Sequence, residues 1–159
     1  MRPTSDRVRE AWMSIVQPWL ERARVLDLFA GSGALGLEAL SRGAASADFV
    51  DVDPLHLALL RKNAQSLHAG ELAIAHRGDA LEYAERLKAG AFDVAFADPP
   101  YDEGLAERVA EIWLRVPFAS ILGVEHRVSE RVPAGGISRR YGTTMLTVYR
   151  RVEKPVGAL

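Results

Sequence analysis

Residues 25–36 read VLDLFAGSGALG, and this stretch decides the fold that the sequence predicts. An apolar run ends at Leu28, and Gly31, Gly33 and Gly36 follow with the spacing G-x-G-x-x-G, ahead of a helical pattern. Glycines at this spacing allow a tight turn between strand and helix and let a ligand approach the backbone closely. The spacing alone is a weak signal, and its simplest interpretation is a dinucleotide-binding turn.

Asp27 lies four residues before Gly31, inside the predicted strand, and favours a different ligand. The pyrophosphate of a dinucleotide would meet its negative charge at short range, and such repulsion is expensive in a partly dry cleft. S-adenosylmethionine carries an ammonium and a sulfonium and no phosphate, so it suits an acid at this place. The alternative is that Asp27 only caps the turn or binds backbone amides.

Strand and helix patterns alternate on both sides of this turn. The predicted strands are residues 24–28, 47–52, 72–76, 92–97 and 120–127, and the predicted helices are 33–42, 54–67, 80–88 and 103–115. A further helix opens the chain and is limited by Pro18, and a hairpin of residues 137–141 and 145–150 closes it. This order predicts an α/β, Rossmann-like fold, whose mostly parallel seven-stranded sheet has helices on both faces and an antiparallel strand from the C-terminal hairpin.

The composition fits one globular domain over residues 1–159, in which we expect no separate target-recognition domain. The 48% hydrophobic and 26% charged residues are ordinary values, and the net charge is −1. The absence of cysteine excludes disulfides and thiolate nucleophiles, and the four histidines show no ligand spacing, so we expect no metal. No apolar stretch reaches 18 residues, and the first ten residues are rich in charge, so we expect a cytoplasmic protein without membrane contact.

Two acids follow the next predicted strands. Asp51 stands at the end of the second strand, where an acid can accept both hydroxyls of a ribose, and Asp79 follows the third strand. Asp79 could accept from an adenine amino group or simply start the next helix. Asp53, directly before Pro54, is better explained as a helix cap.

The predicted strand 92–97 leads directly into Asp98, Pro99, Pro100 and Tyr101. Two prolines end the strand abruptly and fix the backbone, so the Asp98 carboxylate and the Pro99 carbonyl form a rigid pair of acceptors. Such a pair can hold both N–H groups of an exocyclic amine and aim its lone pair at an electrophile. Tyr101 can stack on the base, which must leave its own stack to reach the pocket. The alternative is an ordinary turn with a surface tyrosine.

These motifs resemble those of class I, Rossmann-like S-adenosylmethionine-dependent N-methyltransferases. More narrowly, the chain resembles the RsmD-like family, the bacterial small-subunit ribosomal RNA guanine-N2 methyltransferases. The similar stretches are RPTSDRVRE at 2–10, DLFAGSGALGLEALSRG at 27–43, DPPY at 98–101 and YGTT at 141–144. Members ordinarily carry a basic segment, which would help to grip RNA, ahead of the Arg-Pro-Thr motif, whereas the given sequence begins at that motif.

The resemblance implies roles for residues at the matching positions. S-adenosylmethionine, which leaves as S-adenosylhomocysteine, would be held by Asp27, Phe29, Ala30, Gly31, Ser32, Gly33, Asp51, Val52, Asp79, Ala80 and Asp98. The catalytic turn would be Asp98, Pro99, Pro100 and Tyr101, which would hold the guanine amine. The segment 1–22 would lie over the cleft, with Arg2, Thr4, Arg7 and Arg9 toward the substrate.

Basic residues in the closing hairpin form a second candidate surface for RNA. Arg139 and Arg140 would lie on a strand beside Arg150, and together with the N-terminal arginines they would form a rim that binds phosphates, while Tyr101 contacts the base. A solvated surface with ion pairs is the alternative. The expected partner is ribosomal RNA within a small subunit or its assembly intermediate, and the expected state is a monomer.

Other classes of function remain as alternatives. An adenine-N6 methyltransferase of DNA or RNA would use the same Asp98–Tyr101 turn, although a sequence-specific DNA enzyme normally needs a longer chain to read its target. An N-methyltransferase of a protein or small molecule would use it as well. A dinucleotide-dependent oxidoreductase or a non-catalytic nucleotide-binding module is opposed by Asp27 and by the Asp98–Tyr101 turn.

Overall fold

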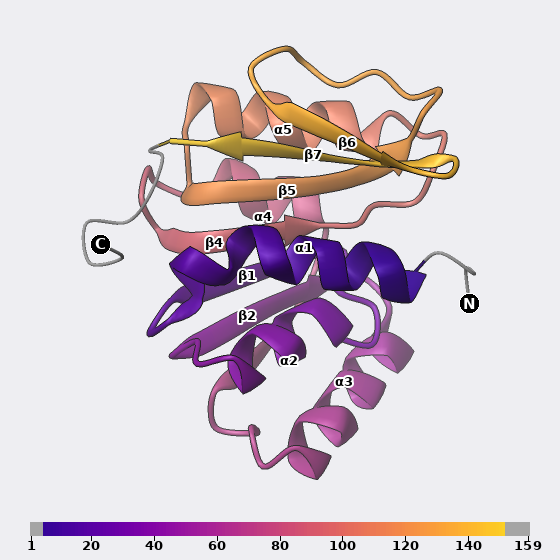
Figure 1. The fold of residues 1–159 in the computed structure, drawn as a ribbon. Helices are drawn as coiled ribbons and strands as arrows, with labels where there is room; N and C mark the ends of the chain where they lie inside the picture. Colours follow the sequence, from indigo (N-terminus) through magenta and orange to yellow (C-terminus); the bar gives the residue numbers. More distant parts are fainter. Residues whose placement is uncertain (1–4, 152–159) are drawn as a thin grey trace.

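The strands of this protein form a single sheet. The computed structural model describes residues 5–151 of the chain. Within this range seven strands lie in the order β3-β2-β1-β4-β5-β7-β6 (Figure 1). Their bounds are β1 Arg24–Leu28, β2 Ser46–Asp51, β3 Ala73–Arg77, β4 Phe92–Ala97, β5 Ala119–Arg127, β6 Ile137–Tyr141 and β7 Thr144–Arg150. The first five strands pair in parallel, as the alternation of strands and helices predicts.

The C-terminal hairpin reverses direction at the edge of this sheet. β7 pairs antiparallel with β5 on one side and with β6 on the other, so β6 runs in the same direction as the parallel strands. Among the described strands, β7 is therefore the one that runs against the others, which confirms the prediction from the hairpin pattern.

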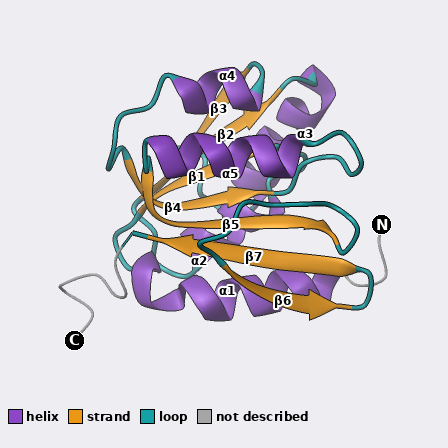
Figure 2. Ribbon diagram, turned by 90° about the horizontal axis from the view of Figure 1, so that it is seen from above, coloured by secondary structure: helices purple, strands orange, loops and turns teal. Residues whose placement is uncertain are grey.

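Helices cover both faces of the sheet (Figure 2). The side chains of α1 (Ser5–Leu20), α2 (Ala34–Ser41) and α3 (Pro54–Ser66) share one buried apolar cluster, and those of α4 (Ala80–Glu85) and α5 (Leu105–Arg115) share another. β4 contributes Val94 and Phe96 to the first cluster and Ala95 and Ala97 to the second, because successive residues of a strand face opposite sides.

α2, α3 and α5 begin and end within two residues of the predicted bounds, and the ends of α1 and α4 differ for reasons that the structure shows. α1 continues through Pro18 to Leu20, although proline removes one backbone hydrogen bond from a helix. Trp19 and Leu20 are 6% and 0% exposed, so the burial of their side chains offsets that loss. α4 ends at Glu85 rather than at residue 88, because Arg86 and Leu87 donate to carbonyls three residues back and the chain then turns toward β4.

The predicted helix cap at Asp53 is confirmed, and a glycine ends the preceding helix. Gly43 has a φ of 106° directly after the end of α2, a conformation that glycine adopts without steric cost. The Asp53 carboxylate accepts from the Leu55 N–H at 2.8 Å and caps α3 ahead of Pro54.

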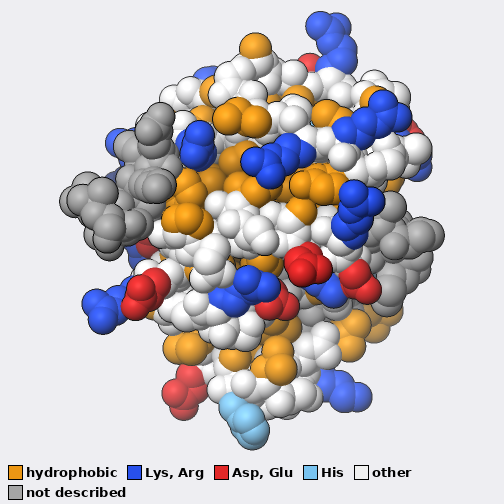
Figure 3. Space-filling model, in the orientation of Figure 1, with side chains coloured by type: hydrophobic (Ala, Val, Ile, Leu, Met, Phe, Trp, Pro, Cys, Tyr) orange, Lys and Arg blue, Asp and Glu red, His pale blue; other side chains and the backbone are white. Residues whose placement is uncertain are grey.

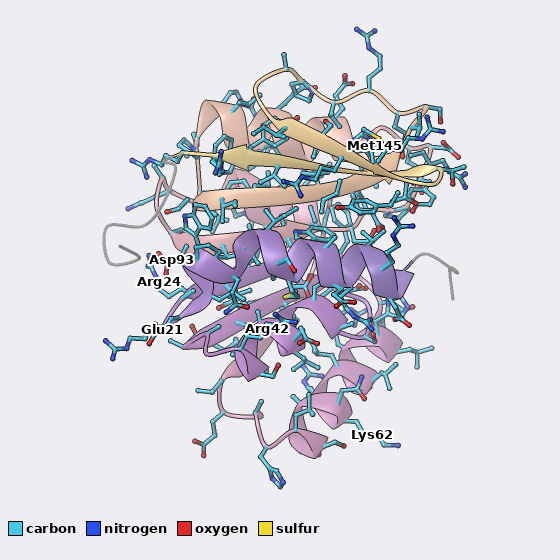
Figure 4. All side chains as sticks on the ribbon, viewed as in Figure 1. Glu21, Arg24, Arg42, Lys62, Asp93 and Met145 are labelled. Atoms are coloured by element: carbon cyan, nitrogen blue, oxygen red, sulfur yellow. The ribbon has the colours of Figure 1, made fainter. Side chains whose placement is uncertain are left out.

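The two ends of the parallel strands differ in character. At their amino ends Arg24 and Asp93 lie side by side on β1 and β4, where the Arg24 backbone N–H donates to the Asp93 carboxylate at 2.8 Å (Figure 4). At their carboxyl ends lie the glycine turn after β1 and the proline turn after β4. In the described part of the chain no helix is both long enough and apolar enough to cross a membrane.

α1 reaches the sheet closely because Gly123 of β5 has no side chain. The Trp12 indole packs over this glycine and meets the Phe96 ring edge-on, with 5.5 Å between ring centroids. A Cβ at position 123 would overlap the indole nitrogen of Trp12. The contact fixes α1 over β4 and β5, with Val8 and Arg9 at the carboxyl ends of the strands.

We predict that Gly123→Ala lowers the free energy of unfolding by about 1–3 kcal/mol, the usual cost of overpacking a core. Chemical denaturation measures the change. Gly70→Ala is the matched control, since the nearest atom to a Cβ there is Gln65 Cγ at 4.0 Å. Equal stability of the two variants would show that Trp12 repacks freely and that this contact does not place α1.

Candidate active site

Two adjoining cavities open at the carboxyl ends of the parallel strands. The larger has a volume of about 490 Å³ and is lined by Phe29, Gly31, Val50, Asp51, Val52, Asp53, His56, Gly78, Ala80, Asp98, Pro99, Pro100 and Tyr101. The smaller, of about 230 Å³, lies toward α1 and is lined by Val8, Arg9, Trp12, Asp27, Phe29, Ala30, Gly31, Ser32, Ala34, Leu35, Asp98 and Glu125. Phe29, Gly31 and Asp98 line both, so the cavities share a wall.

The glycines of the first turn serve two purposes. Gly31 has a φ of 56° and lines both cavities, and a Cβ built on it would meet no atom within 4 Å. Its missing side chain therefore leaves space for a ligand. A Cβ on Gly33 or Gly36 would instead overlap Leu60 or Phe49 of the core, so these two glycines serve the packing of α2.

Asp27 is buried behind this turn, at 1% exposure. Its Oδ2 accepts a hydrogen bond from the Gly36 N–H at 3.0 Å, which ties β1 to the first turns of α2. Burial raises the pKa of Asp27 well above its ordinary value, and the negative charges of Asp98 and Asp51 raise it further, against the lowering effect of the Gly36 bond. A carboxylate in this state gains from any cation that enters the smaller cavity.

Asp51 ends β2 and holds the glycine turn from the other side. Its Oδ2 accepts from the Gly31 N–H at 2.8 Å, and its Oδ1 accepts from the Asp53 N–H at 2.8 Å and lies 3.1 Å from His56 Nδ1. Because a carboxylate only accepts, His56 donates in this contact. The sequence reasoning missed His56, which follows the cap Asp53 by three residues and thus lies over the first turn of α3.

The two candidate residues after β3 separate in the structure. Ala80 lines the larger cavity with its neighbour Gly78, whereas Asp79 is not among the lining residues. The Asp79 carboxylate accepts from the Leu81 N–H at 3.0 Å and caps α4. Asp79 therefore starts a helix, which was one of its two predicted roles. The other role, a contact with the adenine amino group, stays a prediction.

The Asp98–Tyr101 turn is held against the end of β5 by contacts that the sequence did not indicate. The Glu130 carboxylate accepts from the backbone N–H of Arg127 at 2.8 Å and from that of Asp102 at 3.2 Å. The Arg127 guanidinium lies 4.5 Å from the centroid of the Tyr101 ring and 3.4 Å from the Asp102 carboxylate. These contacts fix the ring plane of Tyr101 at the mouth of the larger cavity.

The candidate RNA-binding arginines occupy different places. Arg9 lines the smaller cavity and forms an ion pair with Asp6 at 2.7 Å, while the Arg7 guanidinium lies 5.7 Å from the centroid of the Tyr141 ring. Arg139 lines a groove between α1 and the hairpin, and Arg140 donates to the Gly142 carbonyl at 2.8 Å. The structure therefore does not bring Arg139 and Arg140 to the cavities. Arg2 and Thr4 lie outside the described residues.

The other predicted cofactor residues lie at the cavities. Phe29, Ala30, Ser32 and Val52 line one or both of them, and Gly33 lies within the same turn, with a φ of 83°. Trp12 and Glu125 also line the smaller cavity, and neither was predicted. No local motif marks them, because the pairing of β5 with β4 and the packing of α1 bring them there.

The sheet order and the acids at its carboxyl edge define the class I, Rossmann-like methyltransferase fold. A family profile described as Conserved hypothetical protein 95 matches residues 1–150. The chain belongs to this family, which confirms the resemblance drawn from its motifs.

Individual relatives agree with this assignment. Ribosomal RNA small subunit methyltransferase D of Escherichia coli is 37% identical over 138 residues, which cover 84% of this chain and 68% of the relative. A solved structure from Escherichia coli, named "Putative methyltransferase yhhF", superposes on this chain with a TM-score of 0.82 at 35% identity. The superposition covers 95% of this chain and 88% of that one. An RNA methyltransferase from Salinibacter ruber, in complex with S-adenosyl-L-homocysteine, has the same fold, with a TM-score of 0.72 at 14% identity over 97% and 96% of the chains.

We predict that Asp27→Asn changes how stability depends on pH. Since the folded-state pKa of Asp27 is raised, its contribution to the free energy of unfolding is complete below the ordinary value of 3.8 and is lost as the pH rises through the raised value. The variant cannot lose this proton, so its stability relative to the native protein should rise with pH, by at most about 1.4 kcal/mol per pH unit.

Chemical denaturation of both proteins without ligand, from about pH 4 to about pH 8, measures this difference. Asp93→Asn is the control, because Asp93 lies at the opposite end of the strands and is partly exposed. A difference between Asp27→Asn and the native protein that stays constant over this range would contradict the prediction.

Proposed function

We propose that this chain transfers a methyl group from S-adenosylmethionine to the exocyclic N2 amine of a guanine in small-subunit ribosomal RNA. One observation carries the proposal: Asp98 lines both the cavity below the Asp27–Gly36 turn and the cavity beside Tyr101. Asp98, which would hold the acceptor amine, thus borders the smaller cavity, which suits the methyl donor. The family relatives named as small-subunit ribosomal RNA methyltransferases support the choice of acceptor.

The residues of the two cavities fit S-adenosylmethionine better than a dinucleotide. Among the described lining residues Arg9 is the only lysine or arginine, and it is paired with Asp6, whereas Asp27, Asp51 and Asp98 are acids. Such a wall repels phosphates and attracts cations. Asp27 and the turn at Gly31 would hold the methionine part, Asp51 the ribose, and Val52 and Ala80 the adenine. When bound, S-adenosylmethionine supplies a methyl group on a positively charged sulfur.

The proline turn supplies what the acceptor amine needs. The Asp98 carboxylate and the Pro99 carbonyl would accept its two N–H groups, and the Tyr101 ring, held by Arg127, would stack on the base. The amine nitrogen would bond directly to the methyl carbon as the bond from that carbon to sulfur breaks, so that S-adenosylhomocysteine leaves. The surplus proton of the amine would then pass to water or to Asp98. The chain contains no cysteine, so a thiolate intermediate on the protein plays no part.

RNA would approach over the basic rim of the site. Arg7 beside Tyr141 and Arg127 beside Tyr101 pair a cation with an aromatic ring, a combination that suits phosphates and unstacked bases. Figure 3 shows further arginine side chains among apolar ones over the hairpin, where Arg139 and Arg150 border a groove. With a net charge of −1, the chain suits a target presented by a small subunit or its assembly intermediate in the cytoplasm, to which it binds as a monomer.

The test is transfer of labelled methyl from S-adenosylmethionine to unmodified small ribosomal subunits, with naked ribosomal RNA, DNA and no acceptor run in parallel. We expect label in N2-methylguanosine after digestion of the subunit RNA to nucleosides. Label in N6-methyladenosine instead would favour an adenine methyltransferase. Binding of S-adenosylhomocysteine without label in any nucleoside would point to a protein or small-molecule acceptor.

We predict that Asp98→Ala reduces methyl transfer by about a thousandfold or more, because the amine loses both its orientation and its charge stabilisation. The affinity for S-adenosylhomocysteine, measured by calorimetry, should change by less than about threefold, since other residues hold most of that ligand. Glu103→Ala is the matched control on the same loop, because the Glu103 side chain is exposed. Turnover of Asp98→Ala close to that of the native protein would refute this role of the turn.

A further inference from the structure

The smaller cavity is lined by charged residues of both signs. Asp27, Asp98 and Glu125 line it from the side of the sheet. Arg9 lines it from α1, and among the described residues of this wall it is the only lysine or arginine. A wall that carries both signs of charge suits a ligand that carries both as well.

The methionine part of S-adenosylmethionine is such a ligand. At neutral pH its α-amino group is an ammonium, its sulfur is a sulfonium, and its α-carboxylate is an anion. Acids suit the first two groups but repel the third at short range. The carboxylate end of the ligand therefore needs a positively charged group of the protein.

Arg9 lies where it can meet this need at low cost. It belongs to the second turn of α1, the helix that the packing of Trp12 over Gly123 fixes at the carboxyl ends of the strands. Its guanidinium lies 2.7 Å from the Asp6 carboxylate, and the Asp6 side chain is 76% exposed. An ion pair so open to water contributes little, so the guanidinium can exchange Asp6 for an anion in the cavity.

The start of α2 adds to the positive character of this end of the cavity. Ala34 and Leu35, the first residues of α2, line it together with Ser32. Gly33, the N-cap residue, has no side chain to accept from the first N–H groups of the helix. Arg9, Ser32 and Ala34 also border the groove between α2 and α3, so α1 and the start of α2 meet here.

We propose that Arg9 binds the α-carboxylate of S-adenosylmethionine and gives up its ion pair with Asp6 when the methyl donor enters. The inference rests on the proposed use of S-adenosylmethionine and deepens it, because it assigns Arg9 to the methyl donor rather than to RNA. A guanidinium can donate two parallel N–H bonds to one carboxylate, so this contact would fix the orientation of the methionine part as well as its position.

Arg9 would also make the site selective for the complete methionine group. The acids of the cavity attract any ligand with an ammonium, including one that has no carboxylate. A guanidinium at the same wall adds a preference for the ligand that carries both groups, because only that ligand offers it an anion.

The test is calorimetric and needs no methyl transfer. It compares the affinity of each variant for S-adenosylhomocysteine and for S-adenosyl-3-thiopropylamine, the same molecule without its α-carboxylate. We expect Arg9→Ala to weaken binding of S-adenosylhomocysteine by about tenfold or more, the effect of losing a hydrogen bond between charged groups. On the ligand without carboxylate the substitution should cost less than about threefold, because the contact is already absent.

Three further variants separate binding from a structural role of Arg9. Arg9→Lys keeps the charge but not the paired N–H groups, so we expect an intermediate loss on S-adenosylhomocysteine. Asp6→Ala breaks the same ion pair and keeps the guanidinium, so the affinity should stay within about threefold of the native value or increase. Arg42→Ala is the matched control, since Arg42 pairs with Glu38 at the far end of α2 with similar exposure.

The outcomes separate this inference from the proposed function. Equal losses of Arg9→Ala on both ligands, the same loss in Asp6→Ala, or no loss at all would each overturn the role of Arg9 and leave the proposed function in place. If the affinities change as expected but small subunits receive no methyl group, the proposed acceptor is wrong and the inference stands. If the native protein binds no S-adenosylhomocysteine, both fail.

Discussion

The hydrogen bond from the Gly36 N–H to the buried Asp27 carboxylate is the contact on which the site depends. It joins the last part of β1 to the first turns of α2 and so fixes the glycine turn between them. Asp51 holds the same turn from β2 through the Gly31 N–H. Two acids thus brace one loop, and burial raises the pKa of Asp27 well above its ordinary value.

The parallel sheet brings acids that are far apart in the sequence together at one site. β1, β2, β4 and β5 each deliver a carboxylate at or near the carboxyl end, and these ends meet along a single edge of the sheet. α1 closes this edge from one face because Trp12 packs over Gly123. The acids that line the two cavities thus lie close to one another, as acids of functional sites often do.

Much of the fold and part of the site could be predicted from local patterns. Alternating apolar runs indicated the parallel sheet, the hairpin at Gly142 indicated the reversed strand β7, and Asp53 before Pro54 indicated a helix cap. The acid-and-glycine turn and the proline turn marked Asp27, Gly31, Asp51 and Asp98, which the structure places at two adjoining cavities. These features share a cause, because each depends on residues close together in the chain.

The sequence by itself determined the order of the elements and the chemistry of the two turns, since backbone preferences and short-range hydrogen bonds act over a few residues. Only the tertiary structure decided that Glu125 lines the same cavity as Asp98 and that Arg127 covers the Tyr101 ring. Tertiary packing also decided that α1 continues beyond Pro18 to Leu20. Strand register and the burial of side chains from distant elements set these contacts, and no local pattern encodes them.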